Sequence, residues 1–311
     1  MHVHNRLVAH MNAFARLLVA MALSCLSSAG LAQSPISLLH PSAVTLPKLP
    51  GPSANVSIRI TDQTGVGAEV EQKSVEWIGN TLEIRAGIKM GYADVMGSYT
   101  ILESLGTLSP GIYTLRYVAK ARRFDQPYDE ETKSWTWRFV VIESTKSSAA
   151  IEYYHADFNH YFLTVDEAEI SALDAGLFSG WARTGQTIRV IVPAGEVAGD
   201  APVCRFYGRP EAGLNTHVYT ANATECSILS TQPEVWIWER ADAFEVAPVD
   251  VGGCPIDWLP VFRVWNGLAA ANHRYTTSIS IQSEMVDNGW IPEGSGSPPS
   301  IWCALPPAIS P

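Results

Sequence analysis

The sequence predicts an α+β protein in which an immunoglobulin-like N-terminal β-sandwich precedes a pseudo-threefold repeat domain. The repeat domain is expected to hold three β-β-α-β-β units with short helices. Three observations predict this. Apolar and polar residues alternate with period two from Asn55 to Glu143, as in half-buried strands. An aromatic motif with a histidine recurs three times beyond residue 150. Each copy is followed by a polar residue that suits a helix N-cap.

The composition excludes several classes of protein. The 311 residues are enough for about two domains. Only 17% are charged, whereas ten are Trp, and disordered chains and coiled coils both show the opposite balance. No apolar stretch of about 20 residues follows the N-terminus, which argues against a multi-pass membrane protein. The net charge of −10 argues against nucleic acid as a partner, because binding phosphate needs clusters of Lys and Arg.

Residues 1–32 predict a secretory signal peptide. Arg6 and Arg16 precede an apolar run, and Gly30 and Ala32 supply the small residues of a cleavage site before Gln33. Removing residues 1–32 leaves 19 basic and 31 acidic residues, a net charge of −12. The alternatives are an anchor helix, or lipoprotein processing at Cys25. We therefore expect a secreted or periplasmic protein without a transmembrane span after cleavage, starting at Met1 or Met11.

The sandwich is expected at residues 54–145, after a Pro/Ser-rich leader at 33–53 without a core of its own. Val56, Ile58 and Ile60 alternate with polar residues, and later strands repeat this pattern. Turn signals such as Ser109-Pro110-Gly111 separate the strands. About 90 residues of such strands suit a small immunoglobulin-like sandwich. Asp125, Asp129, Glu130 and Glu131 between two strands could form a calcium site or, more simply, a solvated hairpin tip.

A small, polar linker at 145–150 leads to the repeat domain at about 151–305. Its units are expected at about 151–192, 202–247 and 260–305. His160, His217 and His273 mark equivalent points, 57 and 56 residues apart. Each unit is expected to place the histidine at the start of its second strand. Thr164, Asn222 and Ser278 then suit helix N-caps, while Gly176 and Gly289 suit helix ends.

Four cysteines remain after signal removal, which suggests two disulfides in an oxidising compartment. We favour Cys204–Cys226 and Cys254–Cys303, since each pair then closes a loop within one unit. A zinc site is the rival interpretation, but no C-x-x-C pair supports it.

Three stretches of the C-terminal half carry a resemblance to a known family: Glu152-Tyr153-Tyr154-His155, residues 178–186 and Asn272-His273-Arg274-Tyr275-Thr276-Thr277. On these stretches the C-terminal half resembles an uncharacterised tandem-repeat family, catalogued as a domain of unknown function, found in secreted bacterial proteins. The resemblance covers about residues 151–305 and implies an exported accessory domain without established chemistry. One departure is Val235-Trp236-Ile237-Trp238, where the second unit lacks a glycine before its Trp.

The candidate ligand-binding residues recur in the units. The three histidines could bond their own backbone, contact a ligand or converge on zinc. Trp181, Trp238 and Trp290 are expected at equivalent places, either in the core or as stacking surfaces for sugar rings. Arg205 and Arg263 could pair with carboxylates. Exposed indoles are expected at Trp258 and Trp302, in loops.

No catalytic motif is present: the sequence lacks H-E-x-x-H, G-x-S-x-G and a P-loop. We therefore expect no catalytic residue, resident metal or cofactor, and a non-enzymatic ligand-binding or adhesion protein that recognises glycan or cell-envelope material. The alternatives are a metal-dependent hydrolase that uses one histidine per repeat, and a purely structural protein-interaction module.

Overall fold

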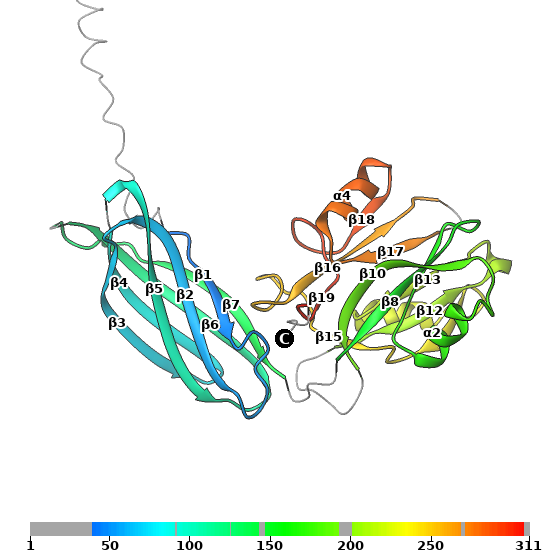
Figure 1. Cartoon of the computed structure of the whole chain (residues 1–311), viewed down its shortest axis with the longest axis horizontal. Coiled ribbons are helices and arrows are strands. Elements are labelled where there is room, and N and C mark those ends of the chain that lie inside the picture. The colour runs from blue at the N-terminus through cyan, green and yellow to red at the C-terminus, as the bar shows by residue number, and fades with distance from the viewer. Residues whose placement is uncertain are drawn as a thin grey trace, which may run out of the picture.

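The structure is a computed structural model that describes residues 39–90, 92–124, 126–142, 147–192, 201–268 and 271–307. The expected signal peptide, with Cys25, and Asp125 lie outside these residues. Figure 1 shows an N-terminal half (residues 39–142) beside a C-terminal half (residues 147–307). The described residues are mostly β-strand with three short α-helices, so the protein is α+β or mainly β.

Two sheets build the N-terminal half. Their strand orders are β1-β2-β5 and β3-β4-β6-β7, and only β4 and β6 pair in parallel. The bounds are β1 Ser42–Leu46, β2 Asn55–Val66, β3 Glu69–Ile78, β4 Thr81–Met90, β5 Tyr92–Thr107, β6 Gly111–Arg123 and β7 Lys133–Val141.

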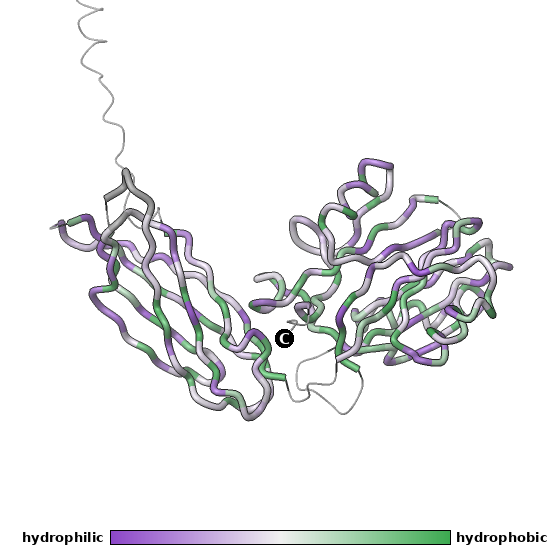
Figure 2. Tube along the Cα trace, in the orientation of Figure 1, coloured by the Kyte–Doolittle hydropathy of each residue, from purple (hydrophilic) through white to green (hydrophobic). Residues whose placement is uncertain are grey.

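One buried cluster takes residues from both of these sheets. Ile58 and Ile60 come from β2, Ile84 from β4 and Tyr117 from β6, and all four are fully buried. These residues are the apolar members of the alternating pattern, because successive side chains of a strand point to opposite faces. Figure 2 shows the same alternation of hydrophobic and hydrophilic residues along the strands.

The expected leader and linker are both wrong in part. Leu39 is fully buried in the N-terminal core, and Ser42–Leu46 pairs with β2, so the leader has a core role from Leu39 onward. Strand β8 begins at Ser147, inside the expected linker. In both places backbone hydrogen bonding to a neighbouring strand outweighs a composition that is typical of loops.

Three segments of the C-terminal half share one local strand order. The first segment (147–192) pairs its strands as β9-β8-β10, the second (201–246) as β13-β12-β14 and the third (259–305) as β17-β16-β18. The bounds are β8 Ser147–His155, β9 His160–Thr164, α2 Glu167–Asp174, β10 Trp181–Ile191, β11 Ala201–Pro202, β12 Cys204–Gly208, the 3-10 helix η2 Pro210–Ala212, β13 His217–Thr220, α3 Ala223–Ser230, β14 Trp236–Arg240, β15 Glu245–Val246, β16 Leu259–Trp265, β17 His273–Thr276, α4 Ile279–Asp287, β18 Ile291–Glu293 and β19 Trp302–Ala304.

The first segment departs from the expected β-β-α-β-β order. Its described part has a single long strand, β10, after the helix, with an irregular register between Arg183 and Thr187. Strand β15 of the second segment pairs with β10, so it extends the sheet of the first segment. Because a β-bulge bends a strand, one long bulged strand can take the place of the two shorter strands that were expected.

The N-cap of each helix stands two residues after a threonine. The N-caps are Asp166, Asn222 and Ser278, whose side chains accept hydrogen bonds from the first-turn amides. The expectation of Thr164 as a cap is therefore wrong: its hydroxyl accepts a hydrogen bond from the Asp166 amide at 3.0 Å. Thr220 and Thr276 do the same for Asn222 and Ser278. Gly176 and Gly289 follow α2 and α4 with φ of +71° and +89°, as expected for glycines at helix ends.

The loop between β15 and β16 joins the two halves. Ile256 of this loop is buried in the N-terminal core, and its amide donates a hydrogen bond to the carbonyl of Arg138 on β7. The Arg138 guanidinium contacts Asp250, with Nε 2.5 Å from Oδ2. The Asp257 carboxylate accepts hydrogen bonds from the amide and hydroxyl of Thr45 on β1, both at 3.0 Å. Apolar and polar contacts therefore fix the loop against both sheets.

Candidate functional site

Tyrosine hydroxyls connect neighbouring segments of the C-terminal half. The Tyr219 hydroxyl donates to the carbonyl of Leu163 at 2.7 Å and accepts from the Leu163 amide at 3.0 Å. The Tyr275 hydroxyl makes the same two contacts with the backbone of Tyr219, at 3.2 and 2.9 Å. Each hydroxyl pairs with the strand one segment earlier, so the three histidine-bearing strands are joined in sequence order.

Buried arginines also contact the segment that precedes their own. Arg205 is 5% exposed, and its guanidinium donates to both carboxylate oxygens of Glu169 in the preceding segment at 2.9 and 2.6 Å. Its Nε lies 2.8 Å from Glu239 of its own segment. Burial opposes the charged form of Glu169, but hydrogen bonds from Arg205 and Thr164 outweigh it and lower the pKa of this carboxyl. Arg205 therefore pairs with carboxylates of the protein itself, and its role toward a ligand stays a prediction.

Arg263 has the same arrangement one segment later. It is 8% exposed and donates to both carboxylate oxygens of Glu225 at 3.2 and 2.9 Å. Its Nε lies 2.9 Å from Glu293. The sequence contained a signal for these partners, since Glu169 and Glu225 each stand three residues after an N-cap. The side chains of these two glutamates turn to the arginine of the next segment.

The first segment carries a glutamate at the equivalent strand position. Register places Arg205 opposite Tyr219, Arg263 opposite Tyr275, and Glu152 opposite Leu163. Glu152 is 2% exposed and accepts hydrogen bonds from Arg274 of the third segment at 3.0 and 2.9 Å. This ion pair, of reversed polarity, joins the third segment to the first.

Two of the three histidines form a direct contact. His160 Nε2 lies 2.9 Å from His217 Nδ1, and His160 Nδ1 lies 3.1 Å from Asn215 Oδ1. His217 Nε2 lies 3.3 Å from the Glu239 carboxylate. Because this carboxylate accepts hydrogen bonds, we assign the proton of neutral His217 to Nε2. His217 Nδ1 is then an acceptor, and neutral His160, which has a single ring proton, can donate either to His217 Nδ1 or to Asn215 Oδ1.

These histidines are held in the neutral form. Burial, reinforced by the nearby His217, lowers the pKa of His160 to about 3. Burial likewise lowers the pKa of His217. His273 lies apart, with Nε2 3.6 Å from Glu293, and burial lowers its pKa to about 3. The described residues contain no group of three or more His, Cys, Asp or Glu side chains that could hold a metal ion.

The tryptophans lie elsewhere than expected. Trp258 is 5% exposed and Trp302 is fully buried, so the expectation of exposed rings there is wrong. Both pack in hydrophobic clusters, and Trp302 stacks on Tyr275 with ring centroids 5.3 Å apart. Trp302 begins strand β19, and Trp258 lies in a loop that itself covers a core, so neither ring is exposed.

The expected equivalence is wrong for Trp238 but holds for Trp181 and Trp290, because Ala182 after Trp181 faces Tyr154 as Ile291 after Trp290 faces Trp265. Trp181 pairs with His155 and Trp290 precedes β18, whereas Trp238 pairs with Phe206. Position 236 precedes Ile237, which faces Tyr207 as Ile291 faces Trp265, so Trp236 is the counterpart of Trp290. Trp238 is 53% exposed, while Trp181 and Trp290 are half-buried.

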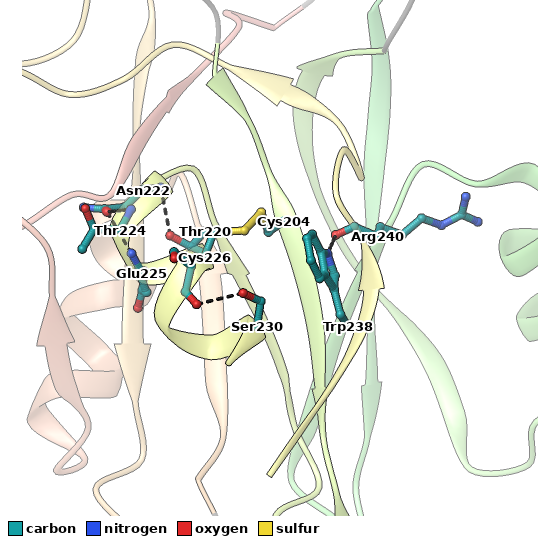
Figure 3. Close-up of a disulfide and its surroundings, with 10 residues drawn as sticks. Cys204, Thr220, Asn222, Thr224, Glu225, Cys226, Ser230, Trp238 and Arg240 are labelled. Atoms are coloured by element: carbon teal, nitrogen blue, oxygen red, sulfur yellow. Dashed lines mark hydrogen bonds between the residues drawn. A yellow bond between two sulfur atoms is a disulfide. The ribbon is translucent and has the colours of Figure 1, made fainter. Parts of the chain in front are cut away.

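Both expected disulfides are present. Cys204–Cys226 ties β12 to α3, and Cys254–Cys303 ties the β15–β16 loop to β19. Figure 3 shows the first disulfide beside the N-cap Asn222, with Trp238 on the neighbouring strand. The Trp238 indole donates a hydrogen bond to the carbonyl of Arg240 at 2.9 Å. This contact holds the exposed ring next to the residue that borders the pocket described next.

A pocket of about 310 Å³ lies between the first two segments. Its apolar lining includes Leu163, Val165 and Phe244. Two arginines and two aspartates line it as well: Arg205, Arg240, Asp166 and Asp242. Arg240 reaches Asp166 at 2.5 Å, which fixes its guanidinium across the segment boundary. Asp242 is exposed, and the sequence contained no motif that singled it out.

Comparison with known proteins identifies one domain type. A family model described as "Domain of unknown function (DUF5648)" matches residues 109–246. The match begins just before β6 of the N-terminal half and ends with β15, so it extends further toward the N-terminus than the expected 151–305 and leaves out the third segment. No curated protein and no solved structure matches the chain. The chain is thus a β-rich, disulfide-bonded protein that contains a domain of unknown function.

Two observations bear on location. Two disulfides are compatible with an extracellular protein. Among the residues that the structure describes, no helix is long and apolar enough to cross a membrane.

Proposed function

We propose that this chain is an exported, non-enzymatic ligand-binding or adhesion protein whose pocket between the first two segments takes a neutral, hydroxyl-rich ligand such as a cell-envelope glycan. The observation that carries the proposal is the lining of that pocket. Its volume of about 310 Å³ falls at the lower end of the range for small-molecule sites. Its two arginines and two aspartates sum to zero formal charge.

Such a lining suits hydroxyl groups. A hydroxyl donates one hydrogen bond and accepts others, so it can bridge a carboxylate and a guanidinium. Arg240 and Asp242 supply this pair at the pocket, while the partly exposed apolar residues Val165 and Ala243 suit the C–H faces of a sugar ring. The half-exposed Trp238 ring, held by its bond to Arg240, adds a flat surface for stacking.

The buried histidines and Arg205 are proposed to position the residues that line the pocket. Arg205 is engaged by Glu169 and Glu239, and Glu239 in turn lies beside His217. These groups are largely buried, which favours a positioning role over direct ligand contact. His273 lies apart from His160 and His217, so the hydrolase with one histidine per repeat is the weaker alternative.

The architecture proposed with this function is an immunoglobulin-like sandwich followed by a pseudo-threefold tandem-repeat domain. A shared core beneath two sheets supports the sandwich. The common strand order and the contacts that lead from the first segment to the second, the third and back to the first support the repeat. Export rests on the signal-like residues 1–32 and on the disulfides. A mature N-terminus at Gln33, found by mass spectrometry of secreted or periplasmic protein, would support it.

The binding test uses the mature chain on a panel of neutral oligosaccharides and peptidoglycan fragments, followed by calorimetry. We expect binding to at least one neutral glycan. Asp242→Asn and Arg240→Gln should each weaken it about tenfold, since each removes a charge-assisted hydrogen bond. Asp287→Asn, an exposed aspartate at the end of α4, is the matched control. Absence of binding across the panel, or affinity that is unchanged in both pocket variants, would overturn the proposal.

A further inference from the structure

A second cavity, of about 450 Å³, lies on the outer face of the four-stranded sheet in the N-terminal half. It is remote in sequence from the pocket between the first two segments, here called the neutral pocket, and shares no lining residue with it. Register brings its residues together: Gln72 of β3 faces Gly87 of β4, which faces Lys120 of β6. One row along, Ser74 faces Arg85, which faces Val118.

The cavity has a defined floor and a rim. Gly87 has no side chain, and a Cβ atom there would lie 2.8 Å from the hydroxyl of Tyr128, so the Tyr128 ring reaches over this point of the sheet. Val118 is 6% exposed and adds an apolar patch to the lining. Lys120 Nζ lies 4.5 Å from the Tyr128 ring centroid, a cation–π contact that holds the ammonium group at the cavity.

The charge of the lining is one-sided. Lys73, Arg85 and Lys120 line the cavity, and none of its described lining residues is acidic. Lys73 pairs with Glu103 and Arg85 with Glu83, both at 2.6 Å. Within the described residues, Lys120 has no carboxylate in ion-pair contact. Glu71, the acid next to Gln72, accepts hydrogen bonds from Arg122 and Tyr128 instead. The cavity therefore holds a cation available to an anionic ligand, in a protein of net charge −10.

We propose that this cavity, the β-face pocket (Gln72, Ser74, Arg85, Gly87, Val118 and Lys120), binds a hydroxylated carboxylate such as an acidic sugar residue. Lys120 and the half-exposed Arg85 bind the carboxylate through charge-assisted hydrogen bonds. Gln72 and Ser74 donate to and accept from hydroxyl groups. The volume suits an organic ligand better than a bare inorganic anion.

An NMR titration of the mature chain with D-glucuronate tests this site, and D-glucose is the neutral comparison of the same ring size. We expect glucuronate to shift the amide resonances of β4 and β6 in a saturable way, with an affinity that falls as salt rises. Glucose should shift them at least tenfold more weakly. Glucuronate shifts that do not include β4 and β6, or equal affinity for the two sugars, would contradict the proposal.

Matched substitutions sharpen the test. Lys120→Gln and Arg85→Gln should each raise the dissociation constant of glucuronate about tenfold or more. Arg59→Gln, at an exposed arginine on β2 of the other sheet, should leave it unchanged. Inorganic sulfate that binds as tightly as glucuronate would reduce the site to a bare anion site and overturn the hydroxylated ligand class. Because the neutral pocket lies in the other half, loss of glycan binding there leaves this result intact.

Discussion

At the residue scale, the buried neutral histidines couple stability to pH. The pKa values of His160 and His273 are lowered to about 3 and that of His217 is also lowered, whereas an unfolded histidine titrates near 6.5. Above pH about 6.5 neither state binds these protons, so there is no cost. Below pH about 6.5 the unfolded chain binds protons at these histidines and the folded chain does not, because its pKa values are lower. The free energy of unfolding therefore falls.

We therefore expect thermal stability to drop as the pH falls from 7.5 to 5. The slope should approach about 1.4 kcal/mol per pH unit for each histidine well below pH 6.5. Thermal and urea unfolding at a series of pH values measure it. His160→Gln removes one titrating group and should flatten the slope. Stability that does not change with pH between 7.5 and 5 would show that these histidines are not buried as neutral groups.

Arg205 carries a second residue-scale prediction. It is 5% exposed between Glu169 and Glu239, so Arg205→Met leaves two carboxylates in a partly buried site without their countercharge. Breaking a buried pair in this way costs about 3–5 kcal/mol. Urea unfolding should show a loss in this range, and Glu169→Gln should cost less in the Arg205→Met background than alone.

Arg85→Met is the control for Arg205→Met. The Arg85 side chain is 57% exposed in its pair with Glu83, and exposed pairs contribute at most about 1 kcal/mol. Similar losses for the two variants would contradict the assignment of Arg205 as a buried structural arginine.

At the scale of elements, two glycines after α2 allow the cost of a left-handed backbone to be measured apart from the cost of a side-chain collision. Gly176 has φ of +71° with open space around its Cβ position. Gly180 has φ of +87°, and a Cβ there would lie 2.2 Å from His155 Nε2. Both alanine variants suffer the left-handed backbone, which costs about 1 kcal/mol. Gly180→Ala must also displace His155, so we expect a loss at least 1 kcal/mol larger, measured by urea unfolding.

Local patterns predicted much of each element and little of how the elements meet. Period-two alternation found the buried face of β2 and β4, and loop lengths favoured the correct disulfides. Glu169 and Arg205 are 36 residues apart and belong to different segments, so no local pattern pairs them. The tryptophans show a further limit. Trp181 faces His155 and Trp238 faces Phe206, so the two rings lie at different register positions of their sheets. A short difference in register is enough to move a side chain to another position on a sheet.

At the scale of the whole molecule, the loop that carries Ile256 couples the two halves. Ile256 is 7% exposed in the N-terminal core, whereas Val251 of the same loop is fully exposed. Ile256→Asp places a charge in that core, so we expect the single unfolding transition of the wild type to split into two in calorimetry. Val251→Asp should leave one transition. Two transitions in the wild type would contradict the coupling.

At this scale the two N-terminal sheets precede the three C-terminal segments along the chain. The sequence places a sandwich-like pattern before the repeated aromatic motif, and the structure has the sheets and segments in that order. The contribution of residues 248–258 to the N-terminal core could not be foreseen, because it joins Asp257 to Thr45 across 212 positions. The family match, which runs from β6 to β15, crosses the same boundary.

Glu152 determines which segment can occupy which place. The other segments carry Arg205 and Arg263 at the equivalent strand position. Arg274 of the third segment pairs with the Glu152 carboxylate. If a second segment from another copy docked where the first belongs, Arg205 would face Arg274, and the two guanidinium groups would repel each other in a buried site. Docking of a second segment in the place of the first is thereby disfavoured. A single glutamate among three similar segments thus makes the first segment the one that fits beside the third.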